Sequence, residues 1–171
     1  MKQDLIEQAG KGIAFTRMNY RKVCQGLKTV TRRRIDGQDR YQHIIPGDIL
    51  YLQEPLGKAG DGGIYVYAPR TPVYLPGGKP LRWRWRRAVL PGRFMPKACG
   101  RRFIRVVGNE LTVLGDLDAD EAGREGITPA EAEPYGGDRR RAFIMLWREI
   151  YGFYQPRQIV RRLEFELWER Q

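Results

Sequence analysis

Arginines alternate with tryptophans in the run Leu81–Arg87, which reads LRWRWRR. In an extended strand, this alternation places the indole rings on one face and the guanidinium groups on the other. Guanidinium groups bind phosphates in a bidentate manner, and indole rings stack on bases. The run therefore predicts a nucleic-acid-binding surface made by four arginines and two tryptophans, namely Arg82, Arg84, Arg86, Arg87, Trp83 and Trp85. The alternative is that both tryptophans face the hydrophobic core.

The rest of the charge is also laid out in blocks. Of the 171 residues, 31 are Lys or Arg and 20 are Asp or Glu, so the formal net charge is +11. A positive excess of this size favours an anionic partner, nucleic acid first. The predicted nucleic-acid contacts therefore include arginines of two further blocks, namely Arg32, Arg33, Arg34, Arg101 and Arg102. Residues 110–138 are by contrast acidic, and the alternative is that they form ion pairs with part of the basic excess.

Residue types that other chemistries need are scarce. Cys24 and Cys99 are the two cysteines and His43 is the single histidine, which disfavours a disulfide framework, a cysteine zinc site and most histidine catalysis. No metal and no cofactor are therefore expected. No run approaches the roughly 20 apolar residues of a membrane-spanning helix, and the first residues lack the apolar stretch of a signal peptide. The sequence predicts a protein without membrane contact, located in the cytoplasm.

Short strands and a few helices must position these side chains. Helices are predicted where a capping residue precedes an apolar stripe, over 118–125 and over 138–151. Strands are predicted from β-branched residues and apolar alternation over 28–35, 49–53, 64–68 and 163–167, and two further strands are predicted within 103–114, on either side of Gly108-Asn109. The acidic segment 128–138 between the two helices is predicted as a loop. Many short strands with glycine turns favour the α+β class and a small β-barrel with helices on its outside. One domain, residues 1–171, accounts for the length.

Five short blocks follow one another along the chain: GLKTVTRRRI, IIPGDILYLQEPL, MPKACGRRFIRVVGNELTVLGDLDADEAGREGI, AFIMLWREIYG and VRRLEFELW. In this order they resemble the ASCH-domain proteins, and within them the branch carried by phages and prophages. The resemblance covers nearly the whole chain from about Thr16 onward. It implies a PUA-like β-barrel with flanking helices, a fold that is widely used to bind RNA or modified bases.

The resemblance also implies a site. Some small ASCH proteins are amidohydrolases that remove the acetyl group from N4-acetylcytidine, and ribonuclease activity is also attributed to members. In the amidohydrolases the working residues are a Lys and a Thr of a K-T-x-T block and a Glu in a later helix. These fall here on Lys28, Thr31 and Glu125. Glu54 remains from the W-V-R-E block of the family, which reads YLQE in this chain, and is a further pocket candidate.

The chain is longer than the minimal amidohydrolases of that family. The additional length is predicted as a long loop insertion over about 57–95, after an N-terminal extension over 1–14. Such an insertion could cover or reshape a pocket, so the ligand does not transfer from the family. The partner stays open between RNA, another nucleic acid and a modified nucleoside.

Amide cleavage places defined demands on the three residues that the resemblance implies. Thr31 would supply the nucleophilic hydroxyl, and Lys28 would accept its proton only if burial and neighbouring cations lower the lysine pKa. Glu125 would protonate the leaving amine or orient water. Because residues three apart on a regular strand point to opposite faces, Lys28 and Thr31 converge only across a bend.

Three functions remain open. The first is a binding module for nucleic acid or a modified nucleoside, in which Lys28 and Thr31 lie on a surface that touches phosphates. The second is a metal-independent hydrolase, either an N4-acetylcytidine-type amidohydrolase or a ribonuclease. The third is a phage accessory protein that binds the acidic surface of another protein.

The nucleic-acid hypothesis predicts an affinity that falls steeply with salt, because each phosphate contact releases counterions. Replacing Arg84, Arg86 and Arg87 together by alanine should weaken the binding of a labelled RNA about tenfold and flatten its salt dependence. Fluorescence anisotropy titrations at several salt concentrations measure both quantities. Absence of binding at low salt, or an affinity that ignores the triple change, would contradict the hypothesis.

Overall fold

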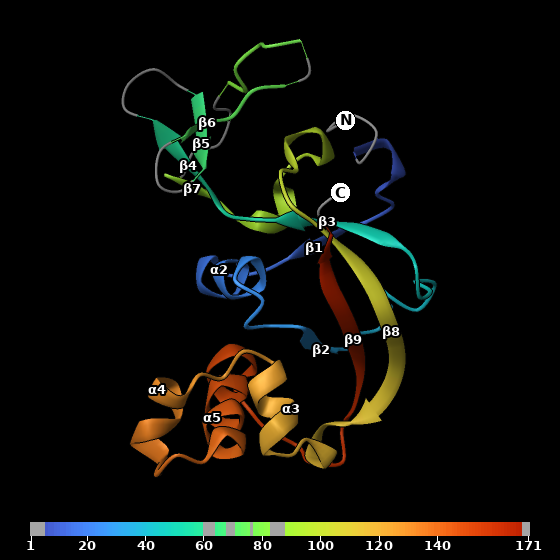
Figure 1. The fold of residues 1–171 in the computed structure, drawn as a ribbon, viewed down its shortest axis with the longest axis vertical. Coiled ribbons are helices and arrows are strands. Elements are labelled where there is room, and N and C mark those ends of the chain that lie inside the picture. The colour runs from blue at the N-terminus through green and yellow to red at the C-terminus, as the bar shows by residue number, and fades with distance from the viewer. Residues whose placement is uncertain (1–5, 60–63, 68–70, 76, 83–87, 169–171) are drawn as a thin grey trace. The chain divides into compact units, whose positions relative to one another are not determined.

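The computed structural model describes residues 6–59, 64–67, 71–75, 77–82 and 88–168 (Figure 1). The chain divides into two compact units. The first unit contains Met1–Arg21, Asp48–Ile104 and Leu167–Gln171, and the second contains Lys22–Gly47 and Arg105–Glu166. Each unit is therefore assembled from segments that lie far apart in the sequence. The single domain over 1–171, with its extension over 1–14, stays a prediction.

Three strands of a five-stranded sheet lie wholly or mostly in the second unit. β2 (Val30–Arg34) runs antiparallel to β9 (Ile159–Trp168), with Thr31 opposite Leu163, and β9 is also a neighbour of β8 (Phe103–Val113). β8 continues through Gly108 and Asn109 as one strand, so the prediction of two strands there is wrong. Consecutive residues of a strand point to opposite faces, and Val30, Thr31 and Arg32 are all buried, so β2 is covered on both sides. A strand covered in this way holds the side chains that it carries in fixed positions.

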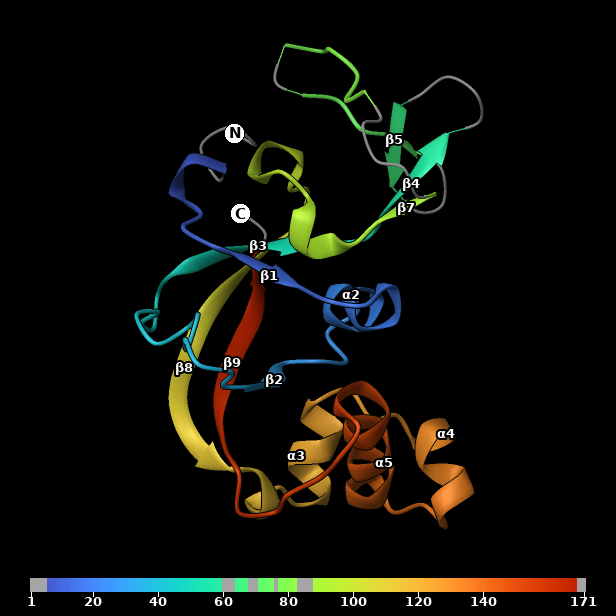
Figure 2. The ribbon, with the colours of Figure 1, turned by 180° about the vertical axis from the view of Figure 1, so that it is seen from behind.

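Three helices follow β8 in the second unit, after a 3-10 turn at Leu114–Asp116. They are α3 (Ala119–Arg124), α4 (Pro129–Ala132) and α5 (Arg139–Tyr151) (Figure 2). Each helix begins at a side chain that caps a main-chain N–H group, and these caps are Asp118, Thr128 and Asp138. The two predicted helices over 118–125 and 138–151 are therefore confirmed, and the loop expected between them contains α4 and a 3-10 turn, Glu133–Tyr135.

The apolar core of the second unit gathers around α5. Phe143 and Trp147 are buried there with residues of the other two helices and with Val160 from β9. Leu146 packs against the same cluster, whereas Ile150 in the last turn is 53 % exposed. The helix thus turns one stripe towards the core and leaves its other faces to solvent.

The first unit contains two sets of paired strands. β1 (Gly12–Ala14) runs parallel to β3 (Ile49–Gln53), and β3 is also a neighbour of the first residues of β8. A second sheet has the order β6-β5-β4-β7, made by β4 (Leu56–Ala59), β5 (Ile64–Tyr67), β6 (Thr71–Pro72) and β7 (Val89–Leu90). Two 3-10 turns, Gly92–Phe94 and Lys97–Cys99, follow it, and α2 (Arg17–Cys24) runs from the first unit into the second.

The region predicted as a long loop insertion, about 57–95, is thus partly folded as a sheet. Val73 and Leu90 are buried in a cluster with Leu56, Met95 and Cys99. The apolar residues of this segment therefore build a small core of their own, which a loop would leave exposed.

The structure is mixed α+β with sheets, which confirms the predicted class at that level. Closure of the strands into a barrel stays a prediction. Within the described part of the chain, no helix is both long and apolar enough to cross a membrane.

Candidate functional site

Lys28 and Glu125 form a buried ion pair in the second unit. The Lys28 Nζ atom donates hydrogen bonds to Glu125 Oε2 and to the Glu125 main-chain oxygen, both at 2.6 Å. The two side chains are only 4 % and 5 % exposed. Lys28 follows a turn at Gly26, whose φ of +71° favours glycine, and Glu125 lies at the carboxyl end of α3. The structure thus brings together two of the three residues that the family resemblance implies.

Burial lowers the pKa of the Lys28 ammonium below its ordinary value of 10.5. The charge and hydrogen bond of Glu125 oppose this effect, whereas the positive charges of Arg33 and Lys22 add to it. A lysine with a lowered pKa can give up its proton more readily than a lysine in water, as a general base requires. The environment therefore supplies one of the conditions that amide cleavage demands.

Thr31 lies one residue before Arg32 on β2, so alternation along the strand points the two side chains to opposite faces. The Thr31 side chain is buried, and its hydroxyl makes no hydrogen bond to Lys28 or to Glu125, all three being described residues. Thr31 therefore lies in the same unit as the ion pair but makes no hydrogen bond to it. Transfer of the hydroxyl proton to Lys28 would need a rearrangement.

Arg32 extends the ion pair into a network. Its Nη1 atom lies 3.3 Å from Glu125 Oε1 and its Nη2 atom lies 2.8 Å from Glu121 Oε2, while its side chain is 3 % exposed. The Arg32 Nε atom is buried without a hydrogen-bond partner among the described residues. A residue expected to contact nucleic acid is therefore directed towards two carboxylates inside the protein.

Glu121 connects this network to β9. It accepts hydrogen bonds at 2.9 Å from both Arg162 Nε and Arg162 Nη2. Hydrogen bonds from Arg162 and then from Arg32 lower the pKa of Glu121 to about 2, although burial acts in the opposite direction. Arg124 pairs with Glu121 and with Glu164 as well. Glu121 is thus engaged by arginines from β2, β9 and α3 itself.

The other predicted nucleic-acid contacts differ in their surroundings. Arg33 is half-buried, and Arg34 pairs with Asp36 while its guanidinium carbon lies 5.6 Å and 5.3 Å from the ring centres of Tyr151 and Phe153. Arg82 and Arg102 are exposed. The predictions for Trp83, Arg84, Trp85, Arg86 and Arg87 fall outside the described residues.

In the first unit, the predicted pocket residue Glu54 is paired with Arg101. Arg101 Nε and Nη2 lie 2.6 Å and 2.9 Å from the two Glu54 oxygens, and the Glu54 side chain is 4 % exposed. Burial disfavours the Arg101 charge, but the hydrogen bonds and charge of Glu54 outweigh it and raise the pKa of Arg101. Each residue therefore satisfies the other in a bidentate pair.

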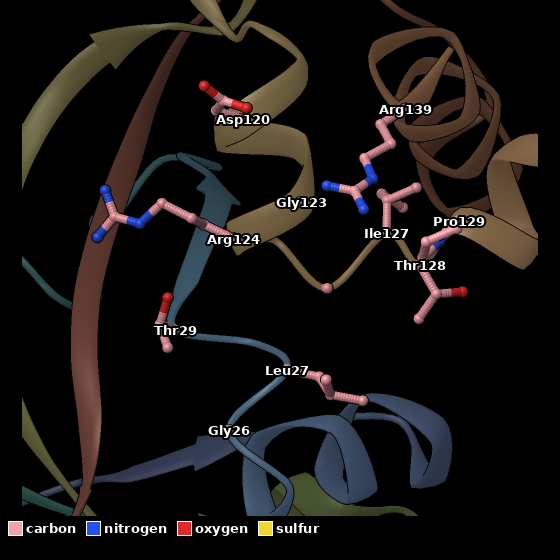
Figure 3. Close-up of a pocket in the computed structure, with 11 residues that line it drawn as sticks. Gly26, Leu27, Thr29, Asp120, Gly123, Arg124, Ile127, Thr128, Pro129 and Arg139 are labelled. Carbon is pink, nitrogen blue, oxygen red and sulfur yellow. The ribbon is translucent and has the colours of Figure 1, made fainter. Parts of the chain in front are cut away.

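A hollow of about 470 Å³ lies in the second unit beside the buried pair (Figure 3). It is lined by the turn before β2, by the segment from α3 to the start of α4, and by Arg139 of α5. Leu27 and Thr29, which flank Lys28 in the sequence, both line it, as do Arg124 and Gly126 on either side of Glu125. Neither this hollow nor Arg139 belongs to the sequence motifs from which the site residues are predicted.

No group of three or more His, Cys, Asp or Glu side chains that could hold a metal ion occurs among the described residues. A protein-family search matches no family, and no curated protein matches the chain. The solved structures that are similar to it include the following two. One is an ASCH domain from Lactobacillus crispatus JV V101, with 10 % identity, a TM-score of 0.44, and coverage of 97 % of this chain and 90 % of that chain. The other is a DUF984 protein from Enterococcus faecalis V583, with 14 % identity, a TM-score of 0.39, and coverage of 90 % and 74 %.

The lowered pKa of Glu121 predicts a specific loss of stability in acid. Its folded pKa of about 2 lies below the ordinary 4.5, so its carboxylate stabilises the fold fully above about pH 4.5. This contribution is lost as the pH falls from about 4.5 towards 2. Glu121→Gln should lower the free energy of unfolding at pH 7 by on the order of 2 kcal/mol, allowing for solvent screening, and reduce its decline in acid.

Urea unfolding at pH 7, 4 and 3 measures both effects. Glu149→Gln is the matched control, because Glu149 is exposed on α5 and forms no ion pair with a described residue. If Glu121→Gln kept the stability and the acid response of the unaltered protein, the pKa assigned to Glu121 would be wrong.

Proposed function

We propose that the chain binds nucleic acid, with RNA before DNA as the partner, and that its second unit contacts phosphates through α5. One observation carries this proposal, namely a difference in pairing between two sets of arginines. Arg32, Arg161 and Arg162 on β2 and β9 each meet a carboxylate. Four arginines of α5 make no ion pair with any described residue, and these are Arg139, Arg140, Arg141 and Arg148.

These α5 arginines are suited to phosphate by exposure and by position. Arg140, Arg141 and Arg148 are exposed, and Arg139 is half-buried. Arg139, Arg140 and Arg141 lie in the first turn, where they add positive charge to the helix end that is already positive. Bound phosphates would remove this repulsion and would meet donors arranged for bidentate contacts.

Aromatic rings near the other end of α5 support the same proposal. Tyr151 ends the helix and Phe153, which follows it, is 40 % exposed. The Arg34 guanidinium lies near both rings. The exposed Phe153 ring beside a guanidinium group offers a flat surface on which an unpaired base can stack, whereas Tyr151 is half-buried against the core. Stacking is the usual way in which single-stranded RNA is held.

The family resemblance adds three details to the proposal: a ligand class, a closed fold and an origin. It adds a modified nucleoside to the candidate ligands, a closed PUA-like barrel as the fold, and an origin in the phage- and prophage-borne branch of the ASCH proteins. We also propose the cytoplasm of a bacterial or phage-infected cell as the location of the protein. Arg33, Arg82, Arg101 and Arg102 stay candidate contacts in this proposal, together with the run of arginines and tryptophans over 83–87.

Replacing Arg140, Arg141 and Arg148 together by alanine tests the proposal. The affinity for a fluorescein-labelled single-stranded RNA should fall about tenfold or more at low salt, because three phosphate contacts are lost. The slope of log affinity against log salt concentration should become smaller by up to about 2, at roughly 0.7 per contact.

The matched control is the triple change of Arg17, Arg21 and Lys79 to alanine, which removes the same charge from exposed positions outside α5. It should alter the affinity much less. Equal effects of the two triple changes would overturn the role of α5, and failure of the unaltered protein to bind RNA at low salt would overturn the proposal itself.

A second candidate function is the metal-independent hydrolase, either an N4-acetylcytidine-type amidohydrolase or a ribonuclease. The contact between Lys28 and Glu125 and the lowered pKa of Lys28 favour it. In the amidohydrolase, a proton first moves from Lys28 to Glu125 within the ion pair. Thr31 then attacks the carbonyl carbon while the neutral Lys28 accepts the hydroxyl proton, and Glu125 gives its proton to the leaving amine as the C–N bond breaks. Water hydrolyses the acyl-Thr31 ester and releases the acid. The third candidate, a phage accessory protein that binds an acidic protein surface, would use the same α5 arginines.

Thr31→Ala tests the hydrolase with little risk to the fold, and Thr31→Ser is its matched partner because it keeps the hydroxyl. Turnover of N4-acetylcytidine or RNA, followed by chromatography, should fall about 10²-fold or more in Thr31→Ala and recover in Thr31→Ser. Lys28→Ala and Glu125→Ala should abolish turnover as well. Unchanged substrates, or turnover that ignores all of these changes, would exclude this function.

A further inference from the structure

The strongest unexplained feature of the second unit is the Arg139 guanidinium group. Arg139 is half-buried, lines the hollow, and forms no ion pair or side-chain hydrogen bond with a described residue. It packs instead on Gly123, since a Cβ added to that glycine would lie 2.8 Å from Arg139 Nη1. A partly desolvated cation without an acceptor is unfavourable. Arg139 therefore offers a place for an anion inside the hollow.

We infer that this hollow is a subsite for one nucleotide of a bound strand, with its phosphate on Arg139. The inference rests on the proposed function and names the place in which a single nucleotide is held. A volume of about 470 Å³ lies in the range of small-ligand pockets, roughly 300–1,000 Å³, and is large enough for a base with its sugar.

The walls of the hollow differ in chemistry. Leu27 is 50 % exposed and Ile127 and Pro129 lie with it among the lining residues, so this part offers apolar contact to the flat face of a base. Figure 3 shows the Arg139 guanidinium reaching from α5 towards Gly123, with Leu27 on the turn before β2. One nucleotide could therefore contact both parts of the hollow, with its base on the apolar Leu27 and its phosphate on the cationic Arg139.

The second arginine of the hollow, Arg124, is already engaged. It pairs with Glu121 and Glu164, and in Figure 3 its side chain extends away from Arg139. Arg139 is therefore the lining cation that is available to a phosphate.

Asp120 restricts the ligand further. It lines the hollow, is exposed, and makes no ion pair with Arg139 or with another described residue. A carboxylate repels a small multiply charged anion but accepts hydrogen bonds from amino and ring N–H groups. The presence of both Arg139 and Asp120 in the lining thus favours a nucleotide whose base carries N–H donors over free inorganic phosphate.

The test measures binding of nucleoside 5′-monophosphates by isothermal titration calorimetry at low salt, with the corresponding nucleosides as phosphate-free probes. Arg139→Ala should weaken monophosphate binding at least tenfold and leave nucleoside binding nearly unchanged. Arg157→Ala is the matched control, because Arg157 is exposed in the same unit and does not line the hollow. It should change neither affinity by more than about twofold.

Weaker binding by Arg139→Ala could also arise from its lost charge or from misfolding. Two further variants therefore test the same site by other changes. Gly123→Ala retains the net charge but displaces the end of the Arg139 side chain, and should weaken monophosphate binding severalfold. Leu27→Glu introduces a carboxylate at an exposed position of the lining and should prevent binding. Circular dichroism and thermal unfolding verify that each variant is folded.

The inference is overturned if the unaltered protein binds no monophosphate, if it binds nucleosides equally well, or if Arg139→Ala and Gly123→Ala behave like Arg157→Ala. The same labelled RNA separates this failure from failure of the proposed function. Suppose that RNA binding weakens when Arg140, Arg141 and Arg148 are replaced, but not when Arg139 or Gly123 is replaced. This outcome would contradict the subsite and leave the proposed function standing. If the unaltered protein bound no RNA, the proposed nucleic-acid function would be wrong.

Discussion

The buried ion pair between Lys28 and Glu125 joins parts of the second unit that lie 97 residues apart in the chain. Because both charges have left water, loss of one partner would strand the other at a cost of about 3–5 kcal/mol. The start of β2 and the end of α3 are therefore held in one geometry. The turn around Leu27 and the segment after α3, which line the hollow, depend on this contact for their positions.

Acidic side chains determine which positive charges remain available to a partner. Glu121 engages Arg32 and Arg162, so Arg32 serves the internal structure despite its place in a basic block. The α5 arginines form no ion pair with a described residue, and under the proposed function their charges are available to an external anion. The net charge of the chain is therefore less informative than its distribution after the internal ion pairs have formed.

Short-range sequence patterns were sufficient to predict two of the helices. The caps Asp118 and Asp138 act over three residues, and the helices that follow them are where the pattern predicts them. The approach of Lys28 to Glu125 came only from the family resemblance, because no spacing rule connects positions so far apart. Arg32 and Arg139 both occur in runs of arginines, and only tertiary structure distinguishes the one that is neutralised from the one that is not.

Two lysines donate hydrogen bonds to main-chain carbonyl oxygens at the end of α3. Lys28 Nζ donates to the oxygen of Glu125 at 2.6 Å, and Lys22 Nζ donates to the oxygen of Gly126 at 2.7 Å and to Glu131. An ammonium group arranges three donors around one nitrogen, so it can serve a carbonyl and a carboxylate at once, whereas a guanidinium group spreads its donors across a plane. Arginine would therefore be a poor replacement at either position, although it preserves the charge, and homologues that keep this geometry should carry lysine at both.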